Sequence, residues 1–135
     1  MEKVKINATL EWAFLSTPNE MSGKYQVDLC NLSEGAVGAL KGLGITVQYK
    51  DAKPEKGYYI TCKSAIPIRA YDENGVVIPV DTLVGNGSKA TCIVGYYDWT
   101  FKNKKGRSPS IQKMVINDLI VYGGVADEAD GVDAL

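Results

Sequence analysis

Residues 96–107 combine aromatic and basic side chains within a short stretch of the chain. From Trp99 to Lys113 there are five basic residues and no acidic one. Aromatic faces stack on unpaired bases and cations neutralise phosphates, and binding of single-stranded nucleic acid uses the two together. The stretch therefore predicts a nucleic-acid-binding surface; the alternative is an aromatic core strand that ends in a solvated lysine turn. Its aromatic and basic residues are Tyr96, Tyr97, Trp99, Phe101, Lys102, Lys104, Lys105 and Arg107.

The alternation of a β-strand limits which of these aromatic residues can face one ligand. Tyr97 and Trp99 share one parity and Tyr96 has the other, so in a strand they point to opposite faces. One parity can line a groove, and the other belongs to the core. We expect Trp99 and Tyr97 to stack on bases. We expect the basic residues that follow to contact phosphates: Lys102, Lys104, Lys105 and Arg107.

A second set of basic residues and tyrosines lies in the middle of the chain. Between Tyr49 and Tyr71, five basic residues are interleaved with four tyrosines. Tyr58 and Tyr59 face opposite ways if they lie in a strand, so one of them belongs to the core. The alternative is a polar face of a β-barrel. The residues of this set that we expect to contact nucleic acid are Tyr58, Lys63, Arg69 and Tyr71.

Composition excludes several kinds of chemical site. The chain has no histidine, which removes the commonest general base and metal ligand together with Ser-His-Asp and Cys-His nucleophilic sites. Three cysteines without a C-x-x-C pair argue against a disulfide framework and a zinc finger. We expect Cys30, Cys62 and Cys92 to be small core residues in a reducing compartment. Residues 72–75 lack the spaced carboxylates of a calcium loop. We expect no cofactor, no metal and no enzymatic activity.

Length and composition describe one globular domain. The chain has 135 residues, of which 45% are hydrophobic and 23% are charged. It has no run of about 18 apolar residues, so we expect no transmembrane helix. The first residues run directly into a strand pattern, so we also expect no signal peptide and a cytoplasmic location.

The last nine residues are acidic, whereas the rest of the chain has a small excess of basic residues. The net charge of the chain is −1, but residues 1–126 contain 15 basic and 12 acidic residues. We expect the tail that follows to be disordered. It is either a solubilising end or a mobile polyanion that competes for a basic groove and docks partner proteins. The residues that would do this are Asp127, Glu128, Asp130, Asp133 and the terminal Leu135.

A period of two predicts most of the secondary structure as strands. Residues 4–14 alternate between apolar and polar side chains, so we expect a long half-buried strand with Trp12 on its buried side. Asn74-Gly75 predicts a hairpin turn. Two long strands at 89–101 and 111–122 are joined by a loop over 102–110. Shorter strands are expected at 25–29, 45–50, 57–63 and 66–70.

Residues 33–43 predict the one helix. Ser33 suits its N-cap and Gly44 suits the position after its end. Three glycines within it, at 35, 38 and 42, weaken the helix and would let it sit close to a sheet. Short strands, two long strands and one helix predict a mainly β fold, a small barrel or a sandwich.

Three segments together resemble the single-stranded DNA-binding protein of short-tailed, lytic bacteriophages and its relatives in other phages. The first is the aromatic strand, basic Gly-containing loop and apolar strand over residues 97–116. The second is the proline strand, Asp and Gly turn and following strand over 63–78, and the third is the acidic tail. Together they span about residues 63–135, and the N-terminal half agrees in pattern only.

The resemblance implies an OB-fold, a five-stranded barrel that grips single strands across one face and between protruding loops. It implies an OB-fold domain over 1–124 with extra strands and one short helix, and an acidic tail over 125–135. The loop at 102–110 would match the hairpin between the fourth and fifth barrel strands. The helix at 33–43 departs from the usual OB order, which places it between the third and fourth strands.

The resemblance also implies a function. The implied function is non-catalytic, sequence-independent binding of single-stranded DNA in phage DNA replication, recombination and repair. Members of this family often form dimers, and their acidic tail contacts replication proteins such as the DNA polymerase and the helicase/primase. Here the tail ends in Leu135 where the family often has an aromatic residue.

Two other functions stay open. A phage structural module, such as a tail-tube or head-decoration protein, also suits a small β-rich chain with Gly-rich turns and an acidic end. An RNA-binding, cold-shock-like barrel is the other, and it would be distinguished by its use of the 2′-hydroxyl.

Overall fold

Strands dominate the architecture of this chain. The computed structural model describes residues 3–15, 23–79 and 84–120. The expected acidic tail over 125–135 lies outside the described residues. The described part contains six strands, one α-helix and a short 3-10 helix in the order β1 (Val4–Phe14), β2 (Tyr25–Cys30), α1 (Glu34–Gly42), η1 (Pro54–Lys56), β3 (Ile60–Ser64), β4 (Ala70–Tyr71), β5 (Ser88–Phe101) and β6 (Lys104–Asp118).

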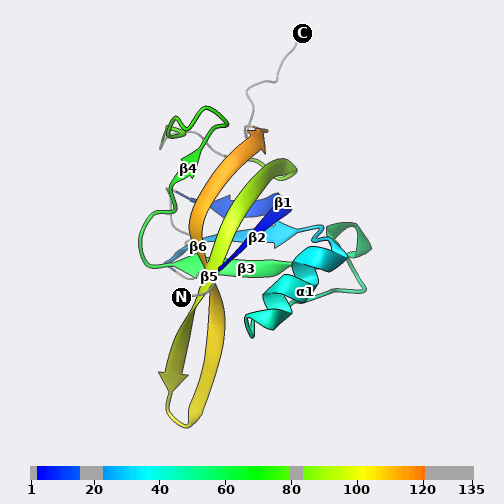
Figure 1. Ribbon diagram of the computed structural model, residues 1–135, viewed down its shortest axis with the longest axis vertical. Coiled ribbons are helices and arrows are strands. Elements are labelled where there is room, and N and C mark those ends of the chain that lie inside the picture. The colour runs from blue at the N-terminus through cyan, green and yellow to red at the C-terminus, as the bar shows by residue number, and fades with distance from the viewer. Residues whose placement is uncertain (1–2, 16–22, 80–83, 121–135) are drawn as a thin grey trace.

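The six strands form one curved sheet in the spatial order β3-β2-β1-β5-β6-β4 (Figure 1). Adjacent strands are antiparallel except for β4, which pairs in parallel with β6. The order β5-β1-β2-β3 is that of a Greek key. β3 also lies close to β6, but the two share no ladder in the described residues, so the sheet is curled and not closed. The predicted fold class, mainly β and OB-fold-like with extra strands and one short helix, is confirmed, and the predicted five-stranded barrel is here a six-stranded sheet that does not close.

The core lies inside the curl of the sheet. Alternate residues of β1 point into it, and Leu10 is fully buried there. Leu29 of β2 and Val94 of β5 are also fully buried and come from the two strands that flank β1. Leu40 of α1 contributes to the same cluster. The period of two in the sequence thus gives each long strand one apolar face, and burial of that face holds the sheet together.

The expected burial of Trp12 is wrong. Its side chain is 49% exposed, and its backbone has a φ of 51°. The pairing of β1 with β2 shifts register between Glu11 and Phe14, and the Trp12 N–H donates to Asn86 Oδ1 at 2.8 Å instead. A bulge of this kind breaks the alternation of side chains. The apolar parity of the sequence therefore ends at Leu10.

The predicted helix is confirmed, with α1 beginning one residue after Ser33. The Ser33 Oγ accepts a hydrogen bond from the Ala36 N–H at 3.1 Å, and Gly44 has a φ of 83° just past the helix. The expectation that the glycines let the helix sit close to the sheet is wrong for Gly38 and Gly42. A Cβ atom at Gly38 or Gly42 would meet no heavy atom within 4 Å, so these positions face open space.

Two of the expected strands are wrong or shortened. Residues 45–50 make only one isolated bridge, between Gln48 and Tyr59. The alternating burial there reflects contact with the core on one side, without a partner strand along its length. Residues 66–70 reduce to the two-residue β4. The hairpin turn is confirmed, because Tyr71 bridges Val77 and Gly75 has a φ of 82°.

All three cysteines are buried, free thiols. Burial raises the pKa of Cys30 and of Cys92 to about 12, and it also raises the pKa of Cys62. The thiols are therefore protonated at neutral pH and behave as small core residues, as the sequence predicts.

A buried ion pair joins η1 to β2. Lys56 Nζ lies 2.6 Å from Asp28 Oδ2, and both side chains are almost fully buried. Thr61 Oγ1 donates to the other carboxylate oxygen at 2.7 Å. The Lys56 ammonium also lies 4.3 Å from the centre of the Tyr59 ring. Lys56, one of the basic residues of the 49–71 set, thus serves the interior and not a surface.

The described part of the chain contains no helix long and apolar enough to cross a membrane. Within residues 3–15, 23–79 and 84–120, no group of three or more histidine, cysteine or acidic side chains is placed to hold a metal ion.

Candidate nucleic-acid interface

The ends of β5 and β6 form a two-stranded ribbon that leaves the sheet. β1 pairs with β5 only as far as Val94, and beyond that residue β5 pairs with β6 alone. The ribbon continues to Phe101 and Lys104, which flank the two-residue turn at 102–103. Figure 1 shows it extending away from the other strands. We call residues 95–110 the ribbon.

The expected loop over 102–110 is therefore wrong, since β6 begins at Lys104. Gly106 and Pro109 favour a loop on composition alone. Within the ribbon β6 pairs with β5 alone and its other side is open, and proline is tolerated in a strand with an open side. The long aromatic strand β5 supplies the partner that keeps these residues extended.

The pairing register decides which ribbon residues share a face. Residues directly opposite one another on an antiparallel pair point to the same side. Tyr97 pairs with Ser108, Trp99 with Gly106 and Phe101 with Lys104. One face, which we call the aromatic face, therefore carries Tyr97, Trp99, Phe101 and Lys104. Its three aromatic side chains are 43%, 39% and 66% exposed in that order.

Lys105 and Arg107 lie on the opposite face of the ribbon. They pair with Thr100 and Asp98, whose parity is that of Tyr96. Tyr96 is half-buried and packs against the core. Of the four basic residues expected after the aromatic strand, only Lys104 shares the face of Trp99. Lys102 lies in the turn, with its Nζ 5.4 Å from the centre of the Phe101 ring.

Gly106 provides the surface on which Trp99 rests. A Cβ atom at Gly106 would lie 2.5 Å from Trp99 Cζ2 and 2.8 Å from Cε2. The indole therefore lies across the glycine backbone of the facing strand, and any side chain at position 106 would collide with it. β6 therefore covers one side of the indole, and the side chain is still 39% exposed.

We expect Gly106→Ala to displace the Trp99 indole and increase its exposure to solvent. The measurement is tryptophan emission and acrylamide quenching, made in a Trp12→Phe background because Trp12 is also exposed. The emission should shift to the red and the quenching constant should rise. Gly38→Ala is the matched control, since a Cβ there meets nothing within 4 Å. Unchanged emission in Gly106→Ala would show that the indole does not rest on this glycine.

A groove opens beside the ribbon where β3 and β6 approach without pairing. It has a volume of about 650 Å³ and is lined by residues of β3 and β6 and by the connection over 65–69. Tyr97 belongs to this lining and also to the aromatic face, so the two surfaces are continuous. Tyr71 of β4 lies in the same lining.

The charge of this groove is positive. Lys24, Lys63 and Arg69 line it, and no acidic residue does so in the described part of the chain. Lys113 lies nearby, with its Nζ 5.7 Å from the centre of the Tyr71 ring. Several cations around an open cleft with a partly apolar wall attract anions and concentrate them there.

The structure thus divides the residues predicted from the sequence. It brings Lys63, Arg69, Tyr71 and Tyr97 together in the groove and places Trp99 and Lys104 next to it on the ribbon. Tyr58 lies elsewhere.

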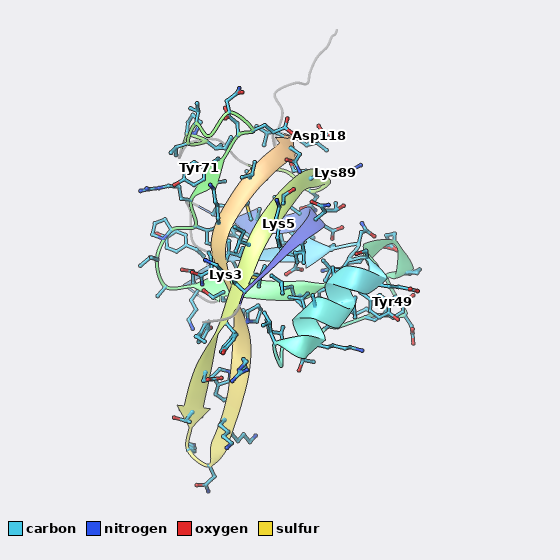
Figure 2. All side chains as sticks on the ribbon, in the orientation of Figure 1. Lys3, Lys5, Tyr49, Tyr71, Lys89 and Asp118 are labelled. Atoms are coloured by element: carbon cyan, nitrogen blue, oxygen red, sulfur yellow. The ribbon has the colours of Figure 1, made fainter. Side chains whose placement is uncertain are left out.

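Tyr58 stacks on Tyr49 with ring centres 5.2 Å apart, and each side chain is 48% exposed. Figure 2 shows Tyr49 beside α1 and Tyr71 on the other side of the molecule. The Tyr49–Tyr58 pair therefore forms a separate surface.

Three residues of this interface were not predicted as contacts: Phe101, Lys24 and Lys113. Phe101 shares the parity of Tyr97 and Trp99, so the alternation itself could have identified it. Lys24 reaches the groove because the next residue, Tyr25, begins β2 opposite Ser64 of β3. No local pattern reveals that placement.

Arg107 makes contacts within the protein through each nitrogen of its guanidinium group. Its Nε lies 2.7 Å from Asp98 Oδ1 and its Nη2 lies 3.4 Å from Oδ2, while Nη1 donates to the Leu43 carbonyl oxygen at 2.9 Å. The guanidinium carbon is 3.9 Å from the centre of the Tyr96 ring. The hydrogen bond from Arg107 lowers the pKa of the Asp98 carboxyl below its ordinary value.

Comparison with known proteins finds likeness at the level of structure. No family model and no curated protein sequence matches the chain. The single-stranded DNA-binding protein from bacteriophage Enc34, truncated at its C-terminus, superposes with a TM-score of 0.66 at 11% identity over 86% of this chain and 85% of that one. The same protein in complex with single-stranded DNA gives 0.65 at 13% identity, over 90% and 89%.

A second solved structure covers almost the whole chain. It is gp2.5, a single-stranded DNA-binding protein encoded by bacteriophage T7, with a TM-score of 0.55 at 14% identity over 96% of this chain and 98% of that one. At these identities the likeness establishes the fold. The chain therefore shares the fold of these phage single-stranded DNA-binding proteins.

Proposed function

We propose that this chain is a non-catalytic, sequence-independent single-stranded DNA-binding protein that acts in phage DNA replication and recombination. The observation that carries the proposal is the continuity, through Tyr97, between the aromatic face of the ribbon and a groove lined by basic residues without an acidic one in the described part. The solved structures that share the fold support it, since they are phage single-stranded DNA-binding proteins and one of them is in complex with single-stranded DNA.

Bases and phosphates would use different parts of this surface. Bases stack on Trp99, Tyr97 and Phe101 along the ribbon and on Tyr71 in the groove. Phosphates meet Lys104 on the ribbon and Lys102 at its turn. Around the groove they meet Lys63, Arg69, Lys24 and Lys113. Stacking and charge neutralisation act on every nucleotide alike, which accounts for binding without sequence preference.

The acidic tail and the oligomeric state complete the proposal. Residues 125–135 would compete with DNA for the basic groove and dock replication proteins such as a DNA polymerase or a helicase/primase. The charge supports this, since four of the last nine residues are acidic and none is basic. We also propose a homodimer in the cytoplasm of the host cell, in keeping with the resemblance in sequence pattern.

Two neighbouring lysines on opposite faces of the ribbon test the proposal. Lys104→Glu is expected to weaken binding of a dT oligomer at least about fivefold at 0.1 M salt, and to lower the slope of log K against log salt concentration by about 0.7. Lys105→Glu changes the charge equally but lies on the other face, so its effect on affinity should be less than about twofold. The measurement is fluorescence anisotropy of a labelled oligomer.

The same titration separates the alternative functions. Duplex DNA should bind far more weakly than the single strand, and RNA of the same sequence should not bind better than DNA. A preference for RNA would favour the cold-shock-like function. If neither nucleic acid binds at low salt, the proposal fails, and a phage structural module of the tail-tube or head-decoration type becomes the better candidate.

A further inference from the structure

We infer that Arg107 is a positioning residue, which fixes the ribbon against the end of α1 and so aims the aromatic face at the groove. The expected effect on DNA binding rests on the proposed function. The fixing of the ribbon by Arg107 rests on the geometry of the free protein alone. It assigns to Arg107 a different role from the phosphate contact that its place in a basic stretch predicts.

The contacts of the guanidinium group are the first argument. Each of its nitrogens faces an acceptor of this chain, and its plane lies against the Tyr96 ring. A guanidinium fork gains its strength from several hydrogen bonds at once. A phosphate could recruit Arg107 only by displacing Asp98 or the Leu43 carbonyl group.

The contacts of Arg107 lie in the part of the ribbon that β1 no longer supports. Beyond Val94 the ribbon loses the support of β1, so its orientation depends on what touches it further along. Arg107 joins the two ribbon strands through Asp98 and reaches the first residue after α1 through the Leu43 carbonyl oxygen. A cation at the C-terminal end of a helix is also favoured by the helix dipole.

Gly44 shows how closely the arginine is held. A Cβ atom at Gly44 would lie 3.4 Å from Arg107 Nη1 and 3.5 Å from Cδ. The arginine therefore packs on the backbone just past the helix, on the side of the ribbon opposite the aromatic face.

A small rotation of the ribbon at the Arg107 contact would displace its tip by a larger distance and so disturb binding. Phe101 lies three residues beyond Asp98, about 10 Å along an extended strand. A tilt of about 15° at the Arg107 contact would therefore move the tip of the ribbon by roughly 3 Å, which is enough to separate a base from its stacking partner.

The test compares Arg107→Ala, Arg107→Lys and Asp98→Ala in the full chain, with a labelled dT oligomer as the probe. Loss of positioning should weaken binding roughly fivefold or more in all three, the loss expected when one base no longer stacks. The salt slope should stay near that of the wild type. Lys89→Ala is the control for charge, because it removes one cation at the opposite end of the molecule from the ribbon (Figure 2).

A phosphate contact gives the opposite pattern. Arg107→Lys would then retain most of the affinity, and Arg107→Ala would lower the salt slope by about 0.7. Asp98→Ala would tighten binding, because it removes an acidic group beside the DNA. Either result would overturn the inference.

Hydrogen exchange of the free protein supplies a readout that does not depend on DNA. The ribbon amides over 97–104 should exchange faster in Arg107→Ala and in Asp98→Ala than in the wild type or in Lys89→Ala. Unchanged exchange in both variants would overturn the positioning role. Faster exchange in a protein that binds no nucleic acid would retain that role and reject the proposed function, so the two failures are distinguishable.

Discussion

Trp99→Ala is expected to weaken binding of single-stranded DNA by about 5- to 150-fold, without a comparable loss of stability. The range corresponds to about 1–3 kcal/mol for one stacked base. The Trp99 side chain is 39% exposed on the ribbon, while one side of its indole is covered by Gly106. Phe101→Ala should have an effect of the same order, because Phe101 is the most exposed aromatic residue of that face.

The measurement is anisotropy of a labelled dT oligomer, which does not depend on the fluorescence of the tryptophan that is removed. Tyr49→Ala is the matched control, since this side chain is also an exposed aromatic residue but lies beside α1. Thermal unfolding of each variant checks that the fold is intact. Equal affinities for Trp99→Ala and the wild type would exclude the aromatic face as the place where bases stack.

Lys56→Met is expected to lower the free energy of unfolding by about 3–5 kcal/mol, the usual cost of breaking a buried ion pair. The substitution leaves the carboxylate of Asp28 buried with Thr61 as its hydrogen-bond donor. Urea denaturation at pH 7 measures the loss. The double variant Asp28→Asn/Lys56→Met should regain much of it, because it removes both charges. A loss below about 1 kcal/mol in Lys56→Met would show that the pair contributes little.

The same pair predicts how stability depends on pH. Burial lowers the pKa of Lys56, but the hydrogen bond and the charge of Asp28 outweigh it, so the pKa is raised above the ordinary value of 10.5. Its contribution is therefore fully present below about pH 10.5 and is lost as the pH rises through the raised value. Between pH 6 and 9, the difference in unfolding free energy between wild type and Asp28→Asn/Lys56→Met, which lacks both charges, should therefore stay constant.

Local patterns predicted the elements that carry their own signals. β1, β2 and α1 follow from alternation or from a capped helical period, and all three occur where expected. The ribbon does not follow from a local pattern, because Gly106 and Pro109 are typical of loops. They lie in a strand here because both pair with β5, and the Trp99 indole fills the space that a side chain at 106 would take. That fact depends on the partner strand and not on the local sequence.

For the candidate site too, some features could be predicted from the local sequence and others could not. The parity of Tyr97 and Trp99 was readable from their spacing, and the register of β5 and β6 then decides which lysine joins them. Tyr58 and Tyr71 looked equivalent in the sequence, yet one pairs with Tyr49 and the other lines the groove. Which of the two tyrosines lies in the groove depends on the tertiary structure, which no local pattern reveals.

The spacing of side chains on the ribbon has a consequence for base pairing. Residues two apart on a strand lie about 7 Å from one another, twice the 3.4 Å rise per base in duplex DNA. A DNA strand whose neighbouring bases rest on Tyr97, Trp99 and Phe101 would therefore be stretched to about twice the rise per base of the duplex. Pairing with a complementary strand and seating on the ribbon exclude each other. With the stacking proposed above, the period of the β-strand would itself select against the double helix, and a DNA hairpin would have to open before its bases could occupy the ribbon.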